Sequence, residues 1–359
     1  MTNRIHRLQQ QMKATGTTLL ALAPGAHMRW ALGFAPHPDE RLCLLLIGPD
    51  KAAFIMPALN ATDARQHTEL PFHEWDDADG PAQALAAALA DVAPAPRKLS
   101  LDETMRADHA LMLLDALPDA ERGLAAAEIG ALRQIKDAAE VAALRDNARI
   151  ADKAQAAVRA ALRPGVTERE LVQVTRDAFA AEGAVCQFAL IAFGPHSAFP
   201  HHHSGDHALQ EGDVVLVDIG GRYGDHMSDI TRMAAFGPPP EGYDAVHAVV
   251  EAAVAAALAA VRPGVAAHTI DDAARGVITQ AGYGAYFTHR TGHGIGTEVH
   301  EPPYMTATNP QVLEEGMVFT IEPGIYLPGR FGIRLEEVAV VTADGAEILS
   351  GLSRGLHRA

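Results

Sequence analysis

Carboxylates with the character of metal ligands stand at the ends of apolar stretches in the C-terminal half of the sequence. Asp218 lies near the end of the stretch 214–219, and Asp229 directly precedes the stretch 230–236. With residues 220–224 as the turn, a hairpin would place both carboxylates side by side, where burial and mutual repulsion are costly. A bound cation removes that cost. On this pair alone, a turn aspartate beside an exposed aspartate is an equally good interpretation.

Histidines follow in a glycine-rich segment. His289, His293 and His300 lie in and around the run 289–296, which holds three glycines. Glycine lets the backbone approach a site closely, and neutral imidazole is a common ligand of borderline divalent metals. A single histidine is more often structural or solvated, but three with this spacing favour a functional site.

Two glutamates complete the set. Glu322 ends the apolar stretch that begins at Met317, and Glu336 precedes the stretch 338–341. Either alone is typical of the surface. With the two aspartates and His293 they make four carboxylates and one imidazole, which suits two hard or borderline divalent ions.

In this order and these local contexts, the five residues resemble the ligands of the pita-bread metallopeptidases, which include methionine aminopeptidase, aminopeptidase P and prolidase. The similarity extends from about residue 126 to the C-terminus. Its signatures are the segments 132–136, 217–220, 228–232, 292–296, 322–324 and 334–336. The preceding α/β domain, of creatinase type, points to the Xaa-Pro branch, prolidase and aminopeptidase P, because methionine aminopeptidase usually lacks it.

The resemblance implies a role for each ligand. Asp218 would bind one ion and His293 with Glu322 the other, while Asp229 and Glu336 would bridge both. The oxygen-rich set favours manganese, with cobalt or zinc able to take its place. The two ions would activate a shared water, and Glu322 would carry a proton to the leaving nitrogen of proline.

The resemblance also implies roles for residues around the ions. His201 and His300 would hydrogen-bond the transition state, and His289 would shape the proline pocket. Thr231 and Arg334 would orient ligands. Two further histidines follow His201 in the chain, so a solvated histidine loop is the alternative for that segment.

A dipeptidase must also neutralise the carboxylate of its substrate, ideally with an arginine. Many prolidases carry an arginine downstream of the residue that corresponds to His300, and here Tyr304 occupies the nearby position. Tyr304 and Arg334 are the predicted substrate contacts on this side. Arg41, in the polar loop 37–41, is the predicted substitute and would cap the carboxylate from its own chain or a partner. A surface arginine paired with Glu40 is the alternative.

Composition excludes other classes of protein. There are 29 basic and 45 acidic residues, a formal charge of −16, which disfavours nucleic-acid binding. Two distant cysteines, Cys43 and Cys186, make neither a disulfide framework nor a thiolate zinc site and favour a reducing compartment. The N-terminus lacks the apolar core of a secretory signal, and the stretch 246–261, interrupted by Glu251, falls short of a membrane span. We expect a soluble cytoplasmic protein.

The elements that position these residues fall into two predicted domains. Residues 1–122 mix short strands (17–23, 42–48 and 52–56) with helical patterns, as in an α/β domain of creatinase type. Residues 123–359 form the catalytic domain, for which the resemblance implies a pita-bread fold.

An internal repeat supports that organisation. The segment 161–166, Ala-Leu-Arg-Pro-Gly-Val, is echoed by 260–265, Ala-Val-Arg-Pro-Gly-Val. Each copy ends a long alanine-rich helical pattern and precedes another helix, with strand-like segments following at 186–193 and around His289. A duplicated α+β unit explains these flanks better than a chance match, and two facing halves would leave a cleft for ligands.

The combined interpretation is a prolidase-type Xaa-Pro dipeptidase acting on small proline-containing peptides. Aminopeptidase P, acting on longer peptides, is the first alternative. A metal-dependent hydrolase or lyase of non-peptide molecules and a non-catalytic binding module are others, because a ligand set reports the metals and not the substrate. Creatinase usually lacks these ligands, so the full set disfavours a creatinase. Because the relatives are often dimers, the resemblance implies a homodimer with the first domain as the contact.

Overall fold

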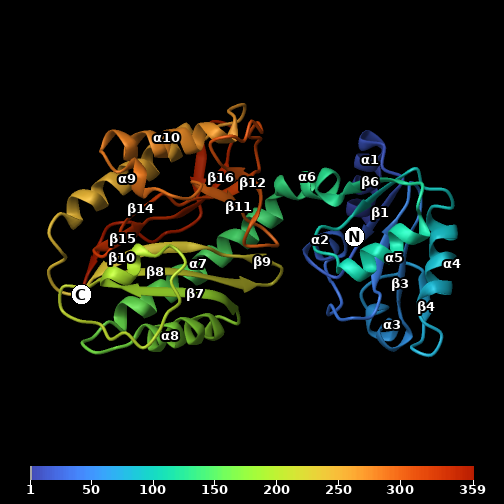
Figure 1. The fold of residues 1–359 in the computed structure, drawn as a ribbon, viewed down its shortest axis with the longest axis horizontal. Coiled ribbons are helices and arrows are strands. Elements are labelled where there is room, and N and C mark those ends of the chain that lie inside the picture. Colours follow the sequence, from blue (N-terminus) through green and yellow to red (C-terminus); the bar gives the residue numbers. More distant parts are fainter. Residues whose placement is uncertain (1) are drawn as a thin grey trace. The chain divides into compact units, whose positions relative to one another are not determined.

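The computed structural model describes residues 2–359, with side chains from residue 4 onward. The chain forms two compact units, Met1–Arg133 and Gln134–Ala359 (Figure 1), and each is described by itself.

Unit 1 is an α/β domain built on a mixed six-stranded sheet of order β4-β3-β2-β1-β5-β6. The strands are β1 Leu19–Leu22, β2 Leu44–Ile47, β3 Ala52–Pro57, β4 Phe72–Trp75, β5 Lys98–Leu101 and β6 Glu121–Leu124. The helices are α1 Thr2–Thr15, α2 Ala26–Leu32, α3 Ala58–Ala64, α4 Ala82–Val92 and α5 Ala107–Ala116, with a 3-10 turn η1 Ala125–Ala127 and α6 Ile129–Gln134. Side chains alternate along β1 into two separate cores, Leu20 and Leu22 on one face and Leu19 on the other. The sheet is therefore covered on both faces, and the three predicted strands are confirmed.

Unit 1 ends at Arg133 rather than at residue 122, where the sequence places the boundary. Ala125 and Ile129 are fully buried in the unit 1 core. The buried carboxylate of Glu128 accepts hydrogen bonds from Thr15 (2.8 Å) and Thr17 (2.6 Å) of the same unit. Packing and these hydrogen bonds, which no local pattern reveals, attach the segment to the first domain.

Unit 2 contains two five-stranded sheets, each with a pair of helices, and a separate two-stranded sheet. The first sheet has the order β18-β10-β8-β7, with β9 paired to β8. Its elements are α7 Ala138–Ala160, α8 Glu168–Ala181, β7 Val185–Phe193, η2 Gly194–Ala198, β8 Val214–Tyr223, β9 His226–Met227, β10 Ile230–Ala235 and β18 His357–Arg358. Helix α8 begins with a capping box, since Thr167 and Glu170 exchange hydrogen bonds.

The second sheet has the order β12-β11-β13-β16-β17, and β14 and β15 pair separately. Its elements are α9 Tyr243–Ala260, α10 Ala267–Gln280, η3 Gly284–Tyr286, β11 Gly292–Gly294, β12 Glu301–Met305, β13 Val318–Ile321, β14 Gly324–Leu327, β15 Phe331–Arg334, β16 Glu337–Val341 and β17 Ala346–Ile348. Figure 1 shows α9 and α10 on one outer side of unit 2 and α8 on the opposite side. His289 itself lies just before the short strand β11, so the strand expected around it is displaced.

The two copies of the repeated segment fold alike. Gly165 and Gly264 both adopt a left-handed conformation, with φ of 78° and 89°. Their backbone amides donate to equivalent carbonyls, those of Leu209 and Leu313, each at 2.9 Å. This shared turn geometry confirms the predicted duplication of an α+β unit.

The predicted turn at residues 220–224 is wrong in its first half, because β8 continues to Tyr223. A Cβ on Gly220 would lie 2.2 Å from the ring of Phe188, and one on Gly221 would lie 2.4 Å from the ring of Phe179. These glycines make room for aromatic rings against the strand. Only Gly224, with φ 61°, supplies a turn conformation.

Helix α9 is long and apolar enough, by length and composition, to cross a membrane, with 18 residues and a mean hydropathy of 1.4. The expectation that this stretch falls short of a span is therefore wrong by that criterion, because the helix starts at Tyr243. Val246, Val250 and Val254 are buried in the core of unit 2. The packed face accounts for their apolar character, and core helices of globular domains meet the same criterion.

Candidate metal centre

The β8–β10 ladder brings the two aspartates together. Asp218 on β8 lies opposite Thr231 on β10, and Asp229 precedes β10 by one residue. From α7, the buried Gln155 donates to one backbone carbonyl of each strand, at 2.9 and 3.0 Å. This amide fixes the spacing of the two strands beside the carboxylates.

All five predicted ligands meet in one cluster. Candidate ligand atoms of Asp218, Asp229 and Glu336 lie within 4.8 Å of one another, and so do those of His293, Glu322 and Glu336. Glu336 belongs to both groups, as a ligand bridging two ions would. A cavity of ≈ 860 Å³ opens onto this cluster, and we call it the metal-site cavity.

Without bound cations, the buried carboxylates of this cluster repel one another. Burial, reinforced by the neighbouring carboxylates, raises the pKa of Asp229 and that of Glu336 well above their ordinary values. One oxygen of Glu336, Oε1, is buried without a hydrogen-bond partner. Divalent cations would neutralise these charges and engage that oxygen, so the residues fit the dinuclear centre that the motif implies.

Glu322 behaves differently. Burial raises its pKa, but the hydrogen bond and charge of His293 outweigh burial and lower the value to about 2. Its Oε1 lies 3.2 Å from His293 Nε2 and accepts from the hydroxyl of Thr320 at 3.3 Å. In the protein without metal, Glu322 is therefore the carboxylate of the cluster whose ionised form a neighbouring side chain stabilises.

His293 presents the nitrogen that a metal would use. Its Nδ1 lies 3.1 Å from the carbonyl oxygen of Gly294, which assigns the proton to Nδ1 and leaves Nε2 facing Glu322 and, at 3.6 Å, Asp229. A Cβ on Gly292 would lie 1.8 Å from the carbonyl oxygen of Thr320. The glycine before the histidine is thus required by close contact with β13.

A hydrogen-bond relay connects Asp218 to the segment that carries the histidines. Arg334 donates to Asp218 and, at 2.7 Å, to the hydroxyl of Tyr326. The single hydroxyl proton of Tyr326 then goes to His289 Nε2 at 2.8 Å, so Nδ1–H of His289 donates to the carbonyl of Arg290 at 2.7 Å. Burial lowers the pKa of His289, consistent with this neutral tautomer.

Arg334 is committed to protein groups. It is 3% exposed, and besides Asp218 and Tyr326 it donates to the hydroxyl of Thr231 at 3.2 Å, which in turn donates to Glu336 at 2.8 Å. The predicted orienting role of Thr231 is thus matched by its contacts. Substrate binding by Arg334 stays a prediction, although the residue lines the metal-site cavity.

The two histidines assigned to the transition state both line the metal-site cavity. The ring of His300 lies 4.2 Å from that of His293, centre to centre. Burial and the nearby His293 and Arg290 lower the pKa of His300 to about 4, so it is neutral near pH 7. His202 instead binds the buried carboxylate of Glu168 at 2.8 Å, which gives it a structural role that His201 does not share.

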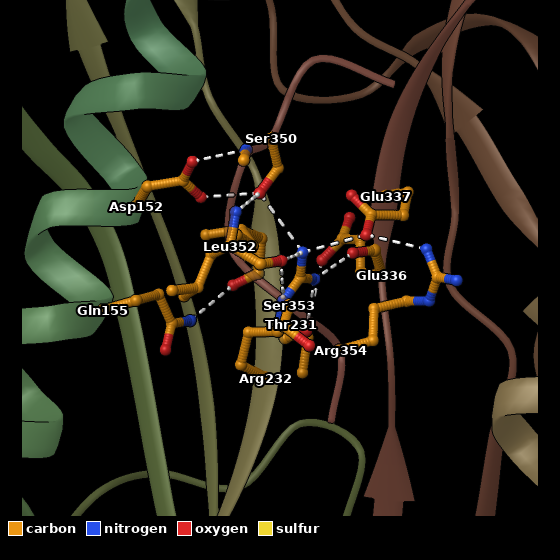
Figure 2. A network of polar contacts seen from close by, with 12 residues as sticks. Asp152, Gln155, Thr231, Arg232, Glu336, Glu337, Ser350, Leu352, Ser353 and Arg354 are labelled. Atoms are coloured by element: carbon orange, nitrogen blue, oxygen red, sulfur yellow. Dashed lines mark hydrogen bonds and ion pairs between the residues drawn. The ribbon is translucent and has the colours of Figure 1, made fainter. Parts of the chain in front are cut away.

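A buried ion-pair network lies beside Glu336 (Figure 2). Arg232 on β10 is 1% exposed, and its guanidinium donates to the carboxylate of Glu337 (2.9 Å) and to the backbone carbonyls of Glu336 and Leu352. Glu337 also accepts from Arg354 at 3.0 Å. Arg232 therefore fixes the backbone that carries the bridging ligand.

Comparison with known proteins shows which family this chain belongs to. A model of metallopeptidase family M24 matches residues 142–343, more than half of the chain. The chain belongs to metallopeptidase family M24. A model of the creatinase/prolidase N-terminal domain matches residues 4–135. The predicted family and its two-domain architecture are confirmed.

Individual M24 relatives span nearly the whole chain. The probable dipeptidase PepE of Mycobacterium tuberculosis is 40% identical over 92% of this chain and 89% of its own length. The Xaa-Pro dipeptidase of Lactobacillus delbrueckii subsp. lactis is 32% identical over 98% of each chain. The solved prolidase of Thermococcus sibiricus is 34% identical, covers 100% of this chain and 99% of its own, and gives a TM-score of 0.94.

Two residues of the M24 chain that were predicted to contact substrate, Tyr304 and Arg41, contact other protein side chains in the structure. Tyr304, on β12, is not among the residues lining the metal-site cavity and instead carries the guanidinium of Arg290 over its ring. Arg41 lies in unit 1, where its guanidinium binds Asp77 through two hydrogen bonds of 2.9 Å and Glu40 through one of 3.0 Å. Contact of either residue with substrate stays a prediction.

Sequence reasoning also missed residues that position the M24 centre. Asp271 on α10 is fully buried, binds Arg275 and accepts from both the amide and the hydroxyl of Thr291, and Arg275 donates to the carbonyl of His289. The four-residue spacing of Asp271 and Arg275 on a helix was the available signal. Tyr326, Thr320 and Arg290 carried no comparable local pattern.

Proposed function

We propose that this M24 protein is a dinuclear metal-dependent Xaa-Pro dipeptidase. The observation that carries the proposal is the single cluster of four carboxylates and one imidazole that opens into a cavity lined by further histidines. The creatinase/prolidase N-terminal domain and relatives named dipeptidase and Xaa-Pro dipeptidase support the proline branch.

When bound, two divalent ions supply Lewis acidity that activates water and polarises the scissile carbonyl. Glu322, as a carboxylate of this cluster, takes a proton from the attacking water. The water oxygen adds to the carbonyl carbon, the carbon–nitrogen bond breaks, and Glu322 delivers the proton to the nitrogen of proline. The hydroxyl of Thr320 holds the Glu322 carboxylate in place for both transfers.

His300 and His201 would stabilise the oxyanion that develops on the carbonyl. His300 is neutral near pH 7 and so retains one N–H to donate, without introducing a second positive charge beside the metals. His201 lines the same cavity from the segment after η2. His289, held by Tyr326, is proposed to shape the pocket for the proline ring.

Cleavage of a matched pair of peptides tests the proposed function. We expect manganese-loaded protein to hydrolyse Ala-Pro at least about tenfold more efficiently than Ala-Pro-Ala, because the site of a dipeptidase uses the free carboxylate of proline. Proline and Ala release, followed by chromatography, would measure both rates. A preference for Ala-Pro-Ala would instead identify an aminopeptidase P, and cleavage of neither would mean that the site acts on another substrate.

Arg41 is proposed to contribute to that carboxylate preference. We expect Arg41→Ala to lower kcat/KM for Ala-Pro more than for Ala-Pro-Ala. Asp77→Asn is the matched control, since it breaks the same surface ion pair but keeps the arginine. Equal losses on both peptides, or equal effects of the two variants, would reduce Arg41 to a surface residue.

The remaining features are proposals supported by the ligand chemistry and the sequence. Manganese is the proposed metal because carboxylate oxygens dominate the site, with cobalt or zinc as substitutes. A cytoplasmic location is consistent with the two unpaired cysteines. The homodimer rests on the family resemblance, and sedimentation velocity of the purified protein would test it.

A further inference from the structure

Two arginines, Arg290 and Arg334, line the metal-site cavity, and only one is committed to protein groups. Arg334 binds Asp218, Tyr326 and Thr231, as described above. Arg290 is half-buried, and among residues 4–359 the structure shows no carboxylate paired with its guanidinium. Its one recorded contact is aromatic, with the guanidinium carbon 4.5 Å from the centre of the Tyr304 ring.

The position of Tyr304 sets where that guanidinium lies. Tyr304 on β12 is the cross-strand partner of the metal ligand His293 on β11. Directly opposite residues of an antiparallel pair project on the same side of the sheet with their Cβ atoms about 5 Å apart. The ring therefore holds Arg290 next to the metal centre, and the charge of Arg290 is close enough to His300 to lower the pKa of that imidazole.

The backbone under Arg290 is also fixed. Its carbonyl accepts the Nδ1 proton of His289, at the end of the relay that starts at Asp218. On the other side, Asp271 accepts from the amide (3.1 Å) and hydroxyl (2.8 Å) of Thr291. The Tyr304 ring and the hydrogen-bonded backbone therefore hold the guanidinium of Arg290 in place, and no carboxylate among residues 4–359 neutralises it. Such a cation is pre-organised to bind an anionic ligand.

We propose that Arg290, supported by the ring of Tyr304, binds the free C-terminal carboxylate of the Xaa-Pro dipeptide. The inference rests on the proposed function and names an arginine of unit 2 that, in addition to Arg41, would make the site select dipeptides. A planar guanidinium binds a carboxylate through two parallel hydrogen bonds, and the stacked ring leaves the edge of the guanidinium free for them. In this chain the tyrosine at position 304 would then support the arginine that recognises the carboxylate.

The test compares Ala-Pro with Ala-Pro amide, which lacks only the negative charge. We expect Arg290→Ala to raise KM for Ala-Pro at least about tenfold while kcat/KM for the amide changes less than about twofold. Arg290→Lys keeps the charge but not the two-pronged geometry and should give an intermediate KM for Ala-Pro. Added guanidinium ion should partly restore Ala-Pro cleavage by Arg290→Ala.

The supporting role of Tyr304 is tested by a second pair of variants. Tyr304→Leu removes the aromatic face and should raise KM for Ala-Pro roughly threefold or more, whereas Tyr304→Phe keeps that face and should raise KM less than Tyr304→Leu does. Metal content and melting temperature equal to wild type would show that each variant is folded and loaded.

Outcomes separate this inference from the proposed function. If wild type prefers Ala-Pro over its amide and Arg290→Ala keeps that preference, the assignment of Arg290 is overturned while the dipeptidase stands. Equal losses of Arg290→Ala on both peptides would also overturn it, because they would show a structural role. If wild type cleaves neither peptide, the proposed function fails and the assignment fails with it.

Discussion

Glu336→Gln is expected to abolish peptidase activity and, at the same time, to stabilise the metal-free protein. Glu336 joins the two ligand groups, and it is 1% exposed among carboxylates that repel it. Glutamine keeps an oxygen to accept from Thr231 and turns the unpartnered Oε1 into an amide group that can donate to its neighbours. Removing a buried charge from such a cluster should stabilise the metal-free fold by about 1 kcal/mol.

Loss of a bridging ligand should lower kcat/KM on Ala-Pro at least about 1,000-fold, or about 4 kcal/mol. Calorimetry with and without manganese would measure the free energy of unfolding of the wild type and of Glu336→Gln. The wild type should gain about 3 kcal/mol when metal is present at one hundred times its dissociation constant, and Glu336→Gln should gain much less.

The neighbouring residue provides the control. Glu337→Gln makes the same chemical change one position away, but Glu337 is paired with Arg232 and Arg354. Removing its charge leaves the buried Arg232 without its ion-pair partner and should destabilise the metal-free protein on the order of 3 kcal/mol. Stability changes of the same sign in the two variants would contradict the assignment of Glu336 to a repulsive, metal-requiring cluster.

Arg232→Met is expected to cause the largest loss of stability, about 3–5 kcal/mol, because it leaves the buried carboxylate of Glu337 with Arg354 as its one arginine partner and removes the donor to two backbone carbonyls. The network in Figure 2 shows why the effect should reach the metals, since Arg232 holds the carbonyl of Glu336 itself. Apparent manganese affinity should fall roughly 10- to 100-fold, as it does when groups that orient ligands are removed. Urea unfolding and metal titration would measure the two effects.

Arg354→Met is the matched control, because Arg354 shares Glu337 as a partner but is 19% exposed at its side chain. Its loss should cost about 1 kcal/mol and leave manganese affinity nearly unchanged. A double-mutant cycle between Arg232 and Glu337 isolates their interaction. Equal costs for the two arginine variants would show that burial of Arg232 is not what the network depends on.

The five ligands could be predicted from the sequence because each has a local signature. A carboxylate at the end of an apolar strand, or a histidine between glycines, is visible within a few residues. Arg232 and Glu337, by contrast, are 105 positions apart, and Tyr326 and His289 are 37 apart. Only the folded sheets bring these partners together, so no local pattern revealed them.

The errors have similar physical causes. Gly220 and Gly221 carry a turn-like composition, but tertiary packing of Phe188 and Phe179 requires glycine within a strand. The end of the first domain was placed too early because Glu128 is attached to it by contacts with residues more than one hundred positions earlier. No local pattern distinguishes Arg290 from a surface arginine, because its contact with Tyr304 forms only when β12 folds beside the histidine segment.

We propose that two divalent ions, held by this cluster, enable the protein to cleave Xaa-Pro dipeptides. The most direct test of this proposal is a titration of metal-stripped protein with manganese, following both bound metal and Ala-Pro hydrolysis. We expect no hydrolysis without metal and maximal hydrolysis at two bound ions per chain. Glu336→Gln should neither bind two ions nor hydrolyse Ala-Pro when manganese is added. Hydrolysis by the stripped protein, or full activity with Glu336→Gln, would contradict it.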